Sequence, residues 1–509
     1  MRTAHRRLLI CGGLAAAILC AGAATAQPLP SSTAAAEAAR IAAREELDAM
    51  HTVLLEAHPG AIDDENPSYR ERIETAYRAA LGRVKDAQDQ HDVMSVADAF
   101  LAPFQDVHLA HTNGVNAGDT SVLSGWMLKR AADGRARVAA TVQDWPVALP
   151  PIGAELVACD GHATARMIEE DVAPFITYVD AQYRDGLLLA RLSWPAMAVQ
   201  RKASCTFRLA QGEMVELAQF YRHATTTEVR SLFASAGSAA VQPPHVNDME
   251  LLPDRTLWIR AGDFQLNARS EKELQHLLER LEATSNPRRI VFDLRGNAGG
   301  SSSIGTRIFA AATGGLVYDE TGLDALPKTR AWWRVSRTDL EAQDDRIAYI
   351  TGRLGSDDPI PRMLVELRAR MQAALDRGEH WIPQDDGEPL VTPAEMVRRH
   401  AHLARFDGQV ILLTDNGCVS ACLDMADLVR LVPGVLHVGE TTGFDSVYLE
   451  LGQVKLPSGN WIKFPMKVWR HRLRGNDQPW VPQVPIVVTG RDNKQVQADV
   501  LAAADRRGH

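Results

Sequence analysis

The chain has 509 residues, which is enough for two to four domains. Its composition is that of a globular protein, with 46% hydrophobic and 23% charged residues, and its formal net charge is -9. This acidic balance, without a long basic cluster, argues against a nucleic acid as a partner.

Residues 1–26 have the pattern of a signal peptide. Arginines near the start precede an apolar run, and that run ends in the small-residue sequence Ala24-Thr25-Ala26. The run is short and rich in small residues, so it fits a retained membrane span poorly. Leu19 before Cys20 also fits a lipoprotein signal poorly. We therefore predict an exported protein, periplasmic or secreted, with no stable membrane span after signal removal.

Residues 27–121 are predicted to form an N-terminal helical region. Apolar residues recur at helical spacing over residues 34–57, again after Asn66-Pro67, and over about 92–103. The first of these helices is expected to end at His58-Pro59-Gly60, because the residue before a proline avoids the helical conformation.

Residues 122–225 alternate like strands. The segment from Gly153 to Gly161 combines a short strand, a tight turn and a following helix, and it resembles the GD-x-I-x-x-I-[DN]-G segment of PDZ domains. The carboxylate-binding loop of PDZ domains is not visible, so a generic hairpin-and-helix module is the alternative. Residues 226–250 are rich in Ser, Ala and Pro and are predicted to be a linker.

Residues 251–500 alternate strands with helices, which predicts an α/β core. The predicted strands carry RTLWIRAG, RIVFDL, QVILLT and VLHVGE. A polar insertion occupies about 320–405 and contains one predicted helix, PRMLVELRARMQAALDRG. Ser458-Gly459 marks the turn of a predicted hairpin.

Two turns between a predicted strand and a predicted helix carry candidate chemistry. The turn at 293–300 is rich in glycine, and the turn at 415–422 carries Ser420. An oxyanion hole needs two N–H donors, and the amides of Gly299 and Ala421 could supply them. The glycine turn fits no phosphate-loop spacing, and the serine turn is not G-x-S-x-G. A plain strand–helix loop and an ordinary serine helix cap are the alternatives.

His108 is the candidate base for a serine nucleophile. If its segment is extended, Asp106 and His108 share one face. His108 and His111 could instead form an H-x-x-H metal pair, but no third ligand is evident, so no metal and no other cofactor is predicted. A structural histidine is the remaining alternative.

Four cysteines lie beyond the predicted signal peptide. Pairing Cys159 with Cys205 and Cys418 with Cys422 would keep each pair within one predicted domain, and disulfides are compatible with export. Free buried thiols are the alternative. Cys418 and Cys422 bracket Ser420, so a disulfide between them is expected to pin that turn.

The order of these motifs resembles one family of serine peptidases. This is the family of tail-specific (carboxy-terminal processing) proteases, the tricorn core protease and interphotoreceptor retinoid-binding protein. The motifs that follow one another as in this family are HPG, QDVHLAH, the PDZ-like segment, IVFDLRGNAGG, VILLTDNGCVSACLDMADLV, HVGETT and LPSG. The resemblance runs from about residue 45 to 490. It implies a crotonase/ClpP-like core of ββα repeats, with the helical region and the PDZ-like module shaping access.

Carried over residue by residue, the resemblance implies Ser420 as nucleophile and His108 as general base. It implies the amides of Ala421 and Gly299 as the oxyanion hole. The tail-specific branch has a lysine base after its GE-x-T-x-G strand, whereas this chain has Asp445 close to that place. The tricorn-like branch, which uses a histidine, is therefore the better match.

The group that orients His108 stays open at this point. Tricorn carries a glutamate before a G-V-x-P-D segment, and here Asn476 or Asp477 lies near its place, with Asp106 as a local alternative.

The predicted function is that of an exported serine peptidase that hydrolyses peptide bonds through an acyl-enzyme. Its partner would be a peptide or protein substrate. The sequence does not specify a cleavage preference or an oligomeric state. A non-catalytic ligand- or peptide-binding protein on the same fold, or an esterase or amidase, are the alternatives.

Overall fold

The computed structural model describes nine stretches of the chain, and the predicted signal peptide lies outside them. The described residues are 33–112, 121–131, 133–177, 181–236, 246–265, 267–314, 329–384, 406–489 and 491–507. None of the helices within these stretches is long and apolar enough to cross a membrane.

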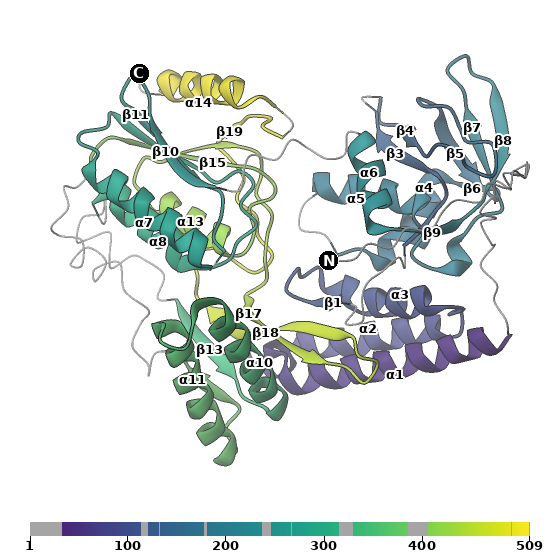
Figure 1. Ribbon diagram of the computed structural model, residues 1–509, viewed down its shortest axis with the longest axis horizontal. Helices are drawn as coiled ribbons and strands as arrows, with labels where there is room; N and C mark the ends of the chain where they lie inside the picture. Colours follow the sequence, from purple (N-terminus) through teal and green to yellow (C-terminus); the bar gives the residue numbers. More distant parts are fainter. Residues whose placement is uncertain are drawn as a thin grey trace, which may run out of the picture.

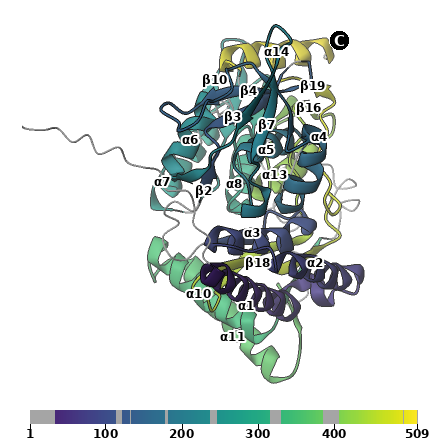
Figure 2. The ribbon, with the colours of Figure 1, turned by 90° about the vertical axis from the view of Figure 1, so that its right-hand side faces the viewer.

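Three parts can be followed in Figure 1: a helical base that begins the described chain, a layered α/β part that holds the C-terminus, and a smaller β module. The base lies beneath the other two parts in Figure 1, and the view turned by 90° in Figure 2 agrees. The active-site candidates lie where the base meets the α/β part.

The helical base contains the three predicted helices. They are α1 (Thr33–Ala57), α2 (Ser68–Val84) and α3 (Gln90–Leu101), with the short turns η1 (Pro59–Ile62) and η2 (Ala102–Phe104). Helix α1 buries Leu47, Met50 and Leu54, whose spacing places them on one face. It ends immediately before His58, as expected from Pro59.

A five-stranded antiparallel sheet packs on this base. Its strands are β1 (Ala110–Thr112), β13 (Arg330–Arg334), β14 (Trp381–Pro383), β17 (Tyr448–Lys455) and β18 (Trp461–Arg470), and β18 pairs with β1, β13 and β17. The α-helices of this part are α10 (Arg337–Leu354) and α11 (Pro359–Asp376). One hydrophobic core joins Leu47 of α1 to Phe464 and Met466 of β18. This shared core brings the N-terminal residues against the C-terminal half of the chain.

The α/β part is a six-stranded sheet with helices on both faces, so the predicted mixed α/β fold is confirmed. The strand order is β10-β11-β12-β15-β16-β19, and only β10 is antiparallel to its neighbour. The strands are β10 (Asn247–Leu251), β11 (Thr256–Ala261), β12 (Arg289–Asp293), β15 (Gln409–Thr414), β16 (Leu436–Gly439) and β19 (Val484–Pro485).

Alternating side chains of this sheet face different helices. Ile290 and Phe292 pack towards α7 (Ala268–Ala283), α8 (Ser302–Thr313) and α13 (Ala421–Arg430). Val291 packs on the opposite face, in the cluster that contains α14 (Asn493–Arg507). Figure 1 shows the two helix layers on either side of the sheet.

The smaller module is built on the antiparallel order β3-β4-β5-β7-β8. Its strands are β2 (Ser121–Leu123), β3 (Trp126–Arg130), β4 (Ala136–Thr141), β5 (Glu155–Cys159), β6 (His162–Ala163), β7 (Ser204–Arg208), β8 (Met214–Ala218) and β9 (Arg222–Ala224). Its helices are α4 (Thr164–Met167), η3 (Ile168–Val172), η4 (Ala173–Phe175), α5 (Ala181–Ser193), η5 (Ala198–Gln200) and α6 (Thr226–Ser235). The predicted turn at Asp160-Gly161 joins β5 to β6.

Regular structure extends further than the sequence patterns predicted. The segment 226–250 begins with α6 and ends with β10, and Val229 and Leu232 of α6 are buried against the β module. The insertion contains α10 in addition to the predicted helix. The spacing of its apolar residues does not predict this helix, because two of its four buried residues are the polar Asp339 and Gln343.

Candidate active site

Ser420 lies at the turn where β15 ends and α13 begins. Its backbone has φ 56° and ψ -129°, a conformation that side-chain-bearing residues avoid and that costs about 1–3 kcal/mol. It occupies the N-cap position of α13, yet its side chain makes no capping hydrogen bond. Its Oγ lies instead 3.4 Å from Nε2 of His108. The hydroxyl is therefore directed away from the helix end.

The residues that flank Ser420 hold the turn tightly. Cys418 and Cys422 are fully buried and form a disulfide with Cα atoms 5.3 Å apart. The amide of Ala421 is the first of α13, and the first amides of a helix have no acceptor within it. This amide therefore offers a hydrogen-bond donor next to the serine hydroxyl.

His108 reaches Ser420 from the segment between η2 and β1. Its Nδ1 lies 3.1 Å from Oδ1 of Asp106, and its backbone N–H donates to the same oxygen at 2.8 Å. The carboxylate accepts, so Nδ1 carries the proton and Nε2 presents its lone pair to Ser420. The side chains of His108 and Asp106 are 7% and 2% exposed, so little water competes for this pair.

The electrostatics of the pair favour its charged form. Burial opposes a positive imidazole, but the hydrogen bond and charge of Asp106 outweigh burial and raise the pKa of His108 above its ordinary value of 6.5. Burial likewise opposes the Asp106 carboxylate, and the bonds from His108 and Ser446 outweigh it and lower the pKa of Asp106. A positively charged imidazole at this position is therefore stabilised.

Ser446 holds the second oxygen of the carboxylate. Its Oγ donates to Oδ2 of Asp106 at 2.5 Å and accepts from the amide of Tyr448 at 3.1 Å. Both oxygens of Asp106 are thereby bonded, one to His108 and one to Ser446, which precedes β17. Sequence reasoning missed Ser446, because no local pattern links it to a residue 340 positions away.

The glycine turn after β12 lies directly against Ser420. A Cβ on Gly299 would be 2.8 Å from Cβ of Ser420 and 2.9 Å from the Val419 carbonyl oxygen, so only glycine fits there. The Gly299 amide donates at 2.8 Å to Oδ1 of Asn297, whose Nδ2 is anchored at 2.6 Å on the carbonyl of Ala261. The predicted oxyanion donor is thus adjacent to Ser420 but already engaged.

Asp415 connects the two turns. Its Oδ2 accepts from the amide of Gly296 at 2.8 Å, and its Oδ1 accepts from the amide of Gly417 at 3.0 Å. Burial raises the pKa of Asp415 to about 6, against the opposing effect of these two amides. Sequence reasoning missed this cross-link too, although an aspartate at a strand end followed by Asn-Gly is a known turn signal.

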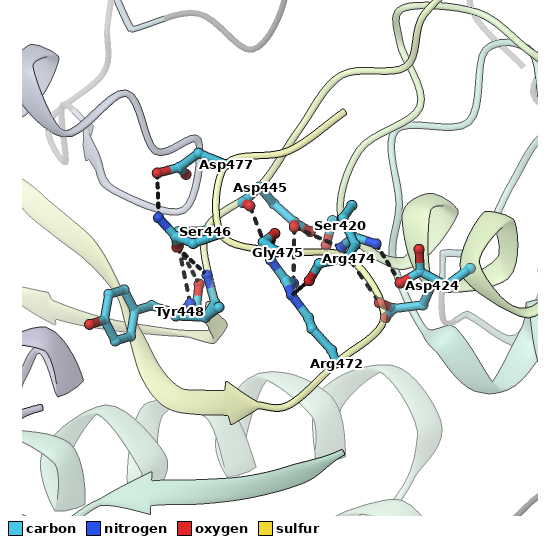
Figure 3. A network of polar contacts seen from close by, with 12 residues as sticks. Ser420, Asp424, Asp445, Ser446, Tyr448, Arg472, Arg474, Gly475 and Asp477 are labelled. Carbon is cyan, nitrogen blue, oxygen red and sulfur yellow. Dashed lines mark hydrogen bonds and ion pairs between the residues drawn. The ribbon is translucent and has the colours of Figure 1, made fainter. Parts of the chain in front are cut away.

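Asp445, which the sequence resemblance placed close to the lysine of the tail-specific branch, is buried and forms ion pairs with arginines. Its Oδ1 lies 2.7 Å from Arg474 and 3.0 Å from Arg472, and Arg474 also reaches Asp427 at 2.6 Å. Figure 3 shows this network beside Ser420. Two guanidinium groups therefore fix the Asp445 carboxylate.

The other predicted residues lie apart from the Ser420–His108 pair. Asp477 accepts from the side chain of Asn476 at 2.5 Å and donates its amide to the backbone of Asp445, so the structure brings Asp106 rather than Asp477 to the imidazole of His108. Of the two acids that the sequence left open, Asp106 is thus the one in contact with His108. Figure 3 shows Asp477 at the far edge of the network from Ser420.

Two further predictions concern residues outside the site. Nε2 of His111 donates to the Glu46 carboxylate at 2.6 Å, so His111 is engaged with α1 rather than paired with His108. Within the stretches that the structure describes, no group of three potential metal ligands occurs. Cys159 and Cys205 form a disulfide between β5 and β7 of the β module.

A strained serine at a strand–helix turn, facing a histidine that is held by a carboxylate, is the arrangement of a serine hydrolase on a mixed α/β fold. Residues 255–476 match the model of peptidase family S41, which covers Gly299 and Ser420 but not His108. This matched segment resembles peptidase family S41, and the chain is a peptidase.

Two similar solved structures support the fold. Mature CPAF in complex with lactacystin is 11% identical, with a TM-score of 0.51 over 88% of this chain and 94% of that chain. A mutant of CPAF is also 11% identical, with a TM-score of 0.50 over 88% of this chain and 93% of that chain. The tricorn protease is less similar, with a TM-score of 0.36 and 13% identity over 92% of this chain and 37% of that chain. No curated protein sequence matches the chain.

Proposed function

We propose that this chain is an exported serine peptidase that cleaves peptide bonds through an acyl-enzyme, with Ser420 as nucleophile, His108 as general base and Asp106 as the acid that orients it. The observation that carries the proposal is the run of contacts from Ser420 Oγ to His108 Nε2 at 3.4 Å and from His108 Nδ1 to Asp106 at 3.1 Å. A separation of 3.4 Å is loose for a hydrogen bond, and such contacts commonly tighten when substrate binds.

In the proposed reaction, Ser420 Oγ attacks the scissile carbonyl while His108 Nε2 takes its proton. The imidazolium then donates that proton to the leaving amine, and an acyl-enzyme remains on Ser420. Water, deprotonated by His108, attacks the ester and releases the product acid. Asp106 stabilises the positive imidazole in both steps, and the raised pKa of His108 supports this role.

The oxyanion of each tetrahedral intermediate requires two donors. We assign one to the Ala421 amide at the start of α13 and the other to the Gly299 amide. Because the Gly299 amide donates to Asn297 in the unliganded chain, it would have to share its hydrogen with the oxyanion or exchange one acceptor for the other. Asp415 would hold the two turns in register while this happens, since it accepts from an amide of each.

The remaining parts of the proposal rest on sequence patterns and on the fold. A core of crotonase/ClpP-like type would carry the site, and residues 122–225 would act as a PDZ-like module that receives a peptide segment. Two disulfides among the described residues support export, since disulfides persist in oxidising compartments. The tricorn-like use of a histidine is supported by Asp445 at the place of the lysine.

The test is hydrolysis of a quenched-fluorescent peptide library, with aryl esters assayed alongside. We expect the wild-type protein to cleave peptides and Ser420→Ala to lose more than about a thousandfold in kcat/KM with an unchanged circular dichroism spectrum. A Ser420→Ala variant that retains the wild-type rate would refute the assignment. Turnover of esters without peptides would favour an esterase, and absence of any turnover would favour a binding protein.

A further inference from the structure

The conformation of Ser420 competes with the ordinary N-cap conformation of a serine at the start of a helix. Serine is among the preferred N-cap residues, and in that role its backbone is extended and its Oγ accepts from the amide of the second or third helical residue. In α13 those amides belong to Cys422 and Leu423, which now donate to the backbone oxygens of Val419 and Ser420 at 3.2 and 2.8 Å. If the Ser420 backbone rotated to the extended conformation, its Oγ could accept a hydrogen bond from one of these amides and would point away from His108.

The present conformation is the less favourable of the two by local physics. A positive φ at a residue with a Cβ costs about 1–3 kcal/mol, whereas an N-cap hydrogen bond stabilises a helix by about 1 kcal/mol. The chain therefore needs a constraint that excludes the cap conformation. The contact with His108, at 3.4 Å, is too long to supply it alone.

The disulfide between Cys418 and Cys422 spans this rotation. Cys418 belongs to the turn and Cys422 to the first turn of α13, and Ser420 lies midway between them. A change in the backbone dihedral angles of Ser420 would move Cys418 relative to α13, and the disulfide between Cys418 and Cys422 opposes that movement. Both cysteines are fully buried, so packing restrains their side chains in addition to the covalent bond.

We propose that the Cys418–Cys422 disulfide is a positioning element of the active site, which keeps Ser420 in its nucleophilic conformation and excludes the helix-cap conformation. The inference rests on the proposed function of Ser420. It predicts that removing this disulfide lowers the rate of chemistry more than it lowers stability, because the cap conformation is locally favourable and leaves the fold intact.

The β module offers a matched control. Cys159 and Cys205 are also buried and bonded, but their disulfide joins β5 to β7 and spans 46 positions, against 4 for the site disulfide. In the chain-entropy account, a disulfide that closes a longer loop stabilises a protein more. Removal of the Cys159–Cys205 disulfide is therefore expected to lower stability more, whereas removal of the Cys418–Cys422 disulfide is expected to lower activity more.

The experiment compares two double variants with the wild-type protein. In Cys418→Ala/Cys422→Ala we expect kcat to fall at least tenfold, KM to change by less than about twofold, and Tm to fall less than in the control. In Cys159→Ala/Cys205→Ala we expect the larger fall in Tm and a kcat within twofold of wild type. Equal kcat in the site variant and the wild-type protein would overturn the proposal, as would losses of kcat that simply follow Tm in both variants.

Reduction of the wild-type protein provides a second route if the site variant fails to fold. A water-soluble phosphine takes up oxygen from water and becomes a phosphine oxide, while the disulfide gains two electrons and two protons and becomes two thiols. Activity should fall in step with alkylation of Cys418 and Cys422, measured by peptide mapping, and return on reoxidation of protein that was reduced but not alkylated. Full activity with both thiols alkylated would contradict the proposal.

Ser420→Ala separates failure of this inference from failure of the proposed function. If Ser420→Ala is inactive while Cys418→Ala/Cys422→Ala is as active as wild type, only the positioning role is wrong. If Ser420→Ala retains wild-type activity, Ser420 is not the nucleophile and the positioning role falls with it.

Discussion

The turn after β12 and the turn after β15 leave neighbouring parallel strands at the same edge of the sheet, yet only the first uses glycine where its backbone takes positive φ. Gly296, Gly299 and Gly300 have φ values of 77°, 93° and 135°. In the turn after β15, the residue with positive φ is Ser420, at 56°. The two turns meet each other, since a Cβ on Gly299 would collide with Ser420.

The difference shows what each turn has to provide. The glycine turn contributes backbone, so it loses nothing by lacking side chains and gains the close approach of Gly299 and Gly300 to their neighbours. In the proposed mechanism the serine turn presents a hydroxyl, and it therefore keeps a side chain in a conformation that glycine would adopt without strain. The disulfide between Cys418 and Cys422 brackets this strained residue.

The largest expected effect comes from replacing the strained residue itself. Ser420→Ala and Ser420→Gly both remove Oγ, so both should lose more than about a thousandfold in kcat/KM. Glycine adopts φ 56° without a Cβ penalty, so Ser420→Gly should be more stable than Ser420→Ala by about 1 kcal/mol. Urea unfolding of the two variants measures the difference. Equal stabilities would show that the serine turn carries no strain.

The second prediction concerns the base that makes the strained conformation useful. Asp106→Asn should lower kcat by roughly a thousandfold or more, because the imidazolium loses its carboxylate partner. In the proposed mechanism His108 acts in its neutral form, so kcat/KM should rise with pH through a pKa above 6.5 in the wild-type protein. Asp106 raises that pKa against burial, so in Asp106→Asn the rise should move to lower pH.

The same pH profiles distinguish the two acids considered from the sequence. Asp477→Asn should leave the position of the acidic limb unchanged, because Asp477 bonds to Asn476 rather than to His108. A shift of the limb in Asp477→Asn and none in Asp106→Asn would reverse the assignment.

The third prediction tests the glycine turn. Gly299→Ala should lower kcat by about ten- to a hundredfold and stability by about 2 kcal/mol, since its Cβ collides with Ser420 and the backbone oxygen of Val419. Gly434→Ala is the matched control, because Gly434 has φ 75° with open space around it. It should cost about 1 kcal/mol of stability and leave kcat unchanged. Similar kcat values for both variants would remove the glycine turn from the site.

The smallest expected effect comes from the cross-link between the turns. Asp415→Asn retains one acceptor oxygen and loses the other, so kcat should fall only severalfold, with thermal stability and KM measured alongside. The folded-state pKa of Asp415, about 6, lies above its ordinary value of 3.8, so the folded protein binds this proton more tightly than the unfolded chain. The stability penalty of the ionised carboxyl is therefore present above pH 6 and is relieved as the pH falls from about 6 towards 4.

Unfolding experiments at two pH values measure this linkage. Between pH 7 and pH 5, the wild-type protein should gain about 1 kcal/mol relative to Asp415→Asn. An unchanged difference between the two proteins would place the titration elsewhere.

The sequence predicted the parts of the fold that repeat a short pattern. Buried strands such as β12 and β15 are continuous apolar runs, and α1 has apolar residues at helical spacing, so both kinds of element were found. Helix α10 has no such stripe, and α6 lies in a segment whose Ser, Ala and Pro content suggested a linker. In both cases tertiary packing stabilises a helix that the local sequence pattern does not predict.

The site was predictable only as far as motif order reached. Ser420 and His108 were proposed together because family motifs name both, and the structure brings them into contact although 312 positions separate them. The contacts of Ser446 with Asp106 and of Asp415 with Gly296 depend on how distant segments pack, and single-chain periodicity contains no information on that packing. The positive φ of Ser420 is likewise invisible in a sequence that shows serine before a helix.

The most direct test of the account is covalent labelling of the folded protein with a fluorophosphonate, followed by peptide mapping and by labelling rates in His108→Ala. The account predicts one adduct on Ser420 in the wild-type protein, with labelling at least a hundredfold slower in His108→Ala. An adduct on another residue, or an equal rate in His108→Ala, would contradict the claim that Ser420 is a nucleophile activated by His108.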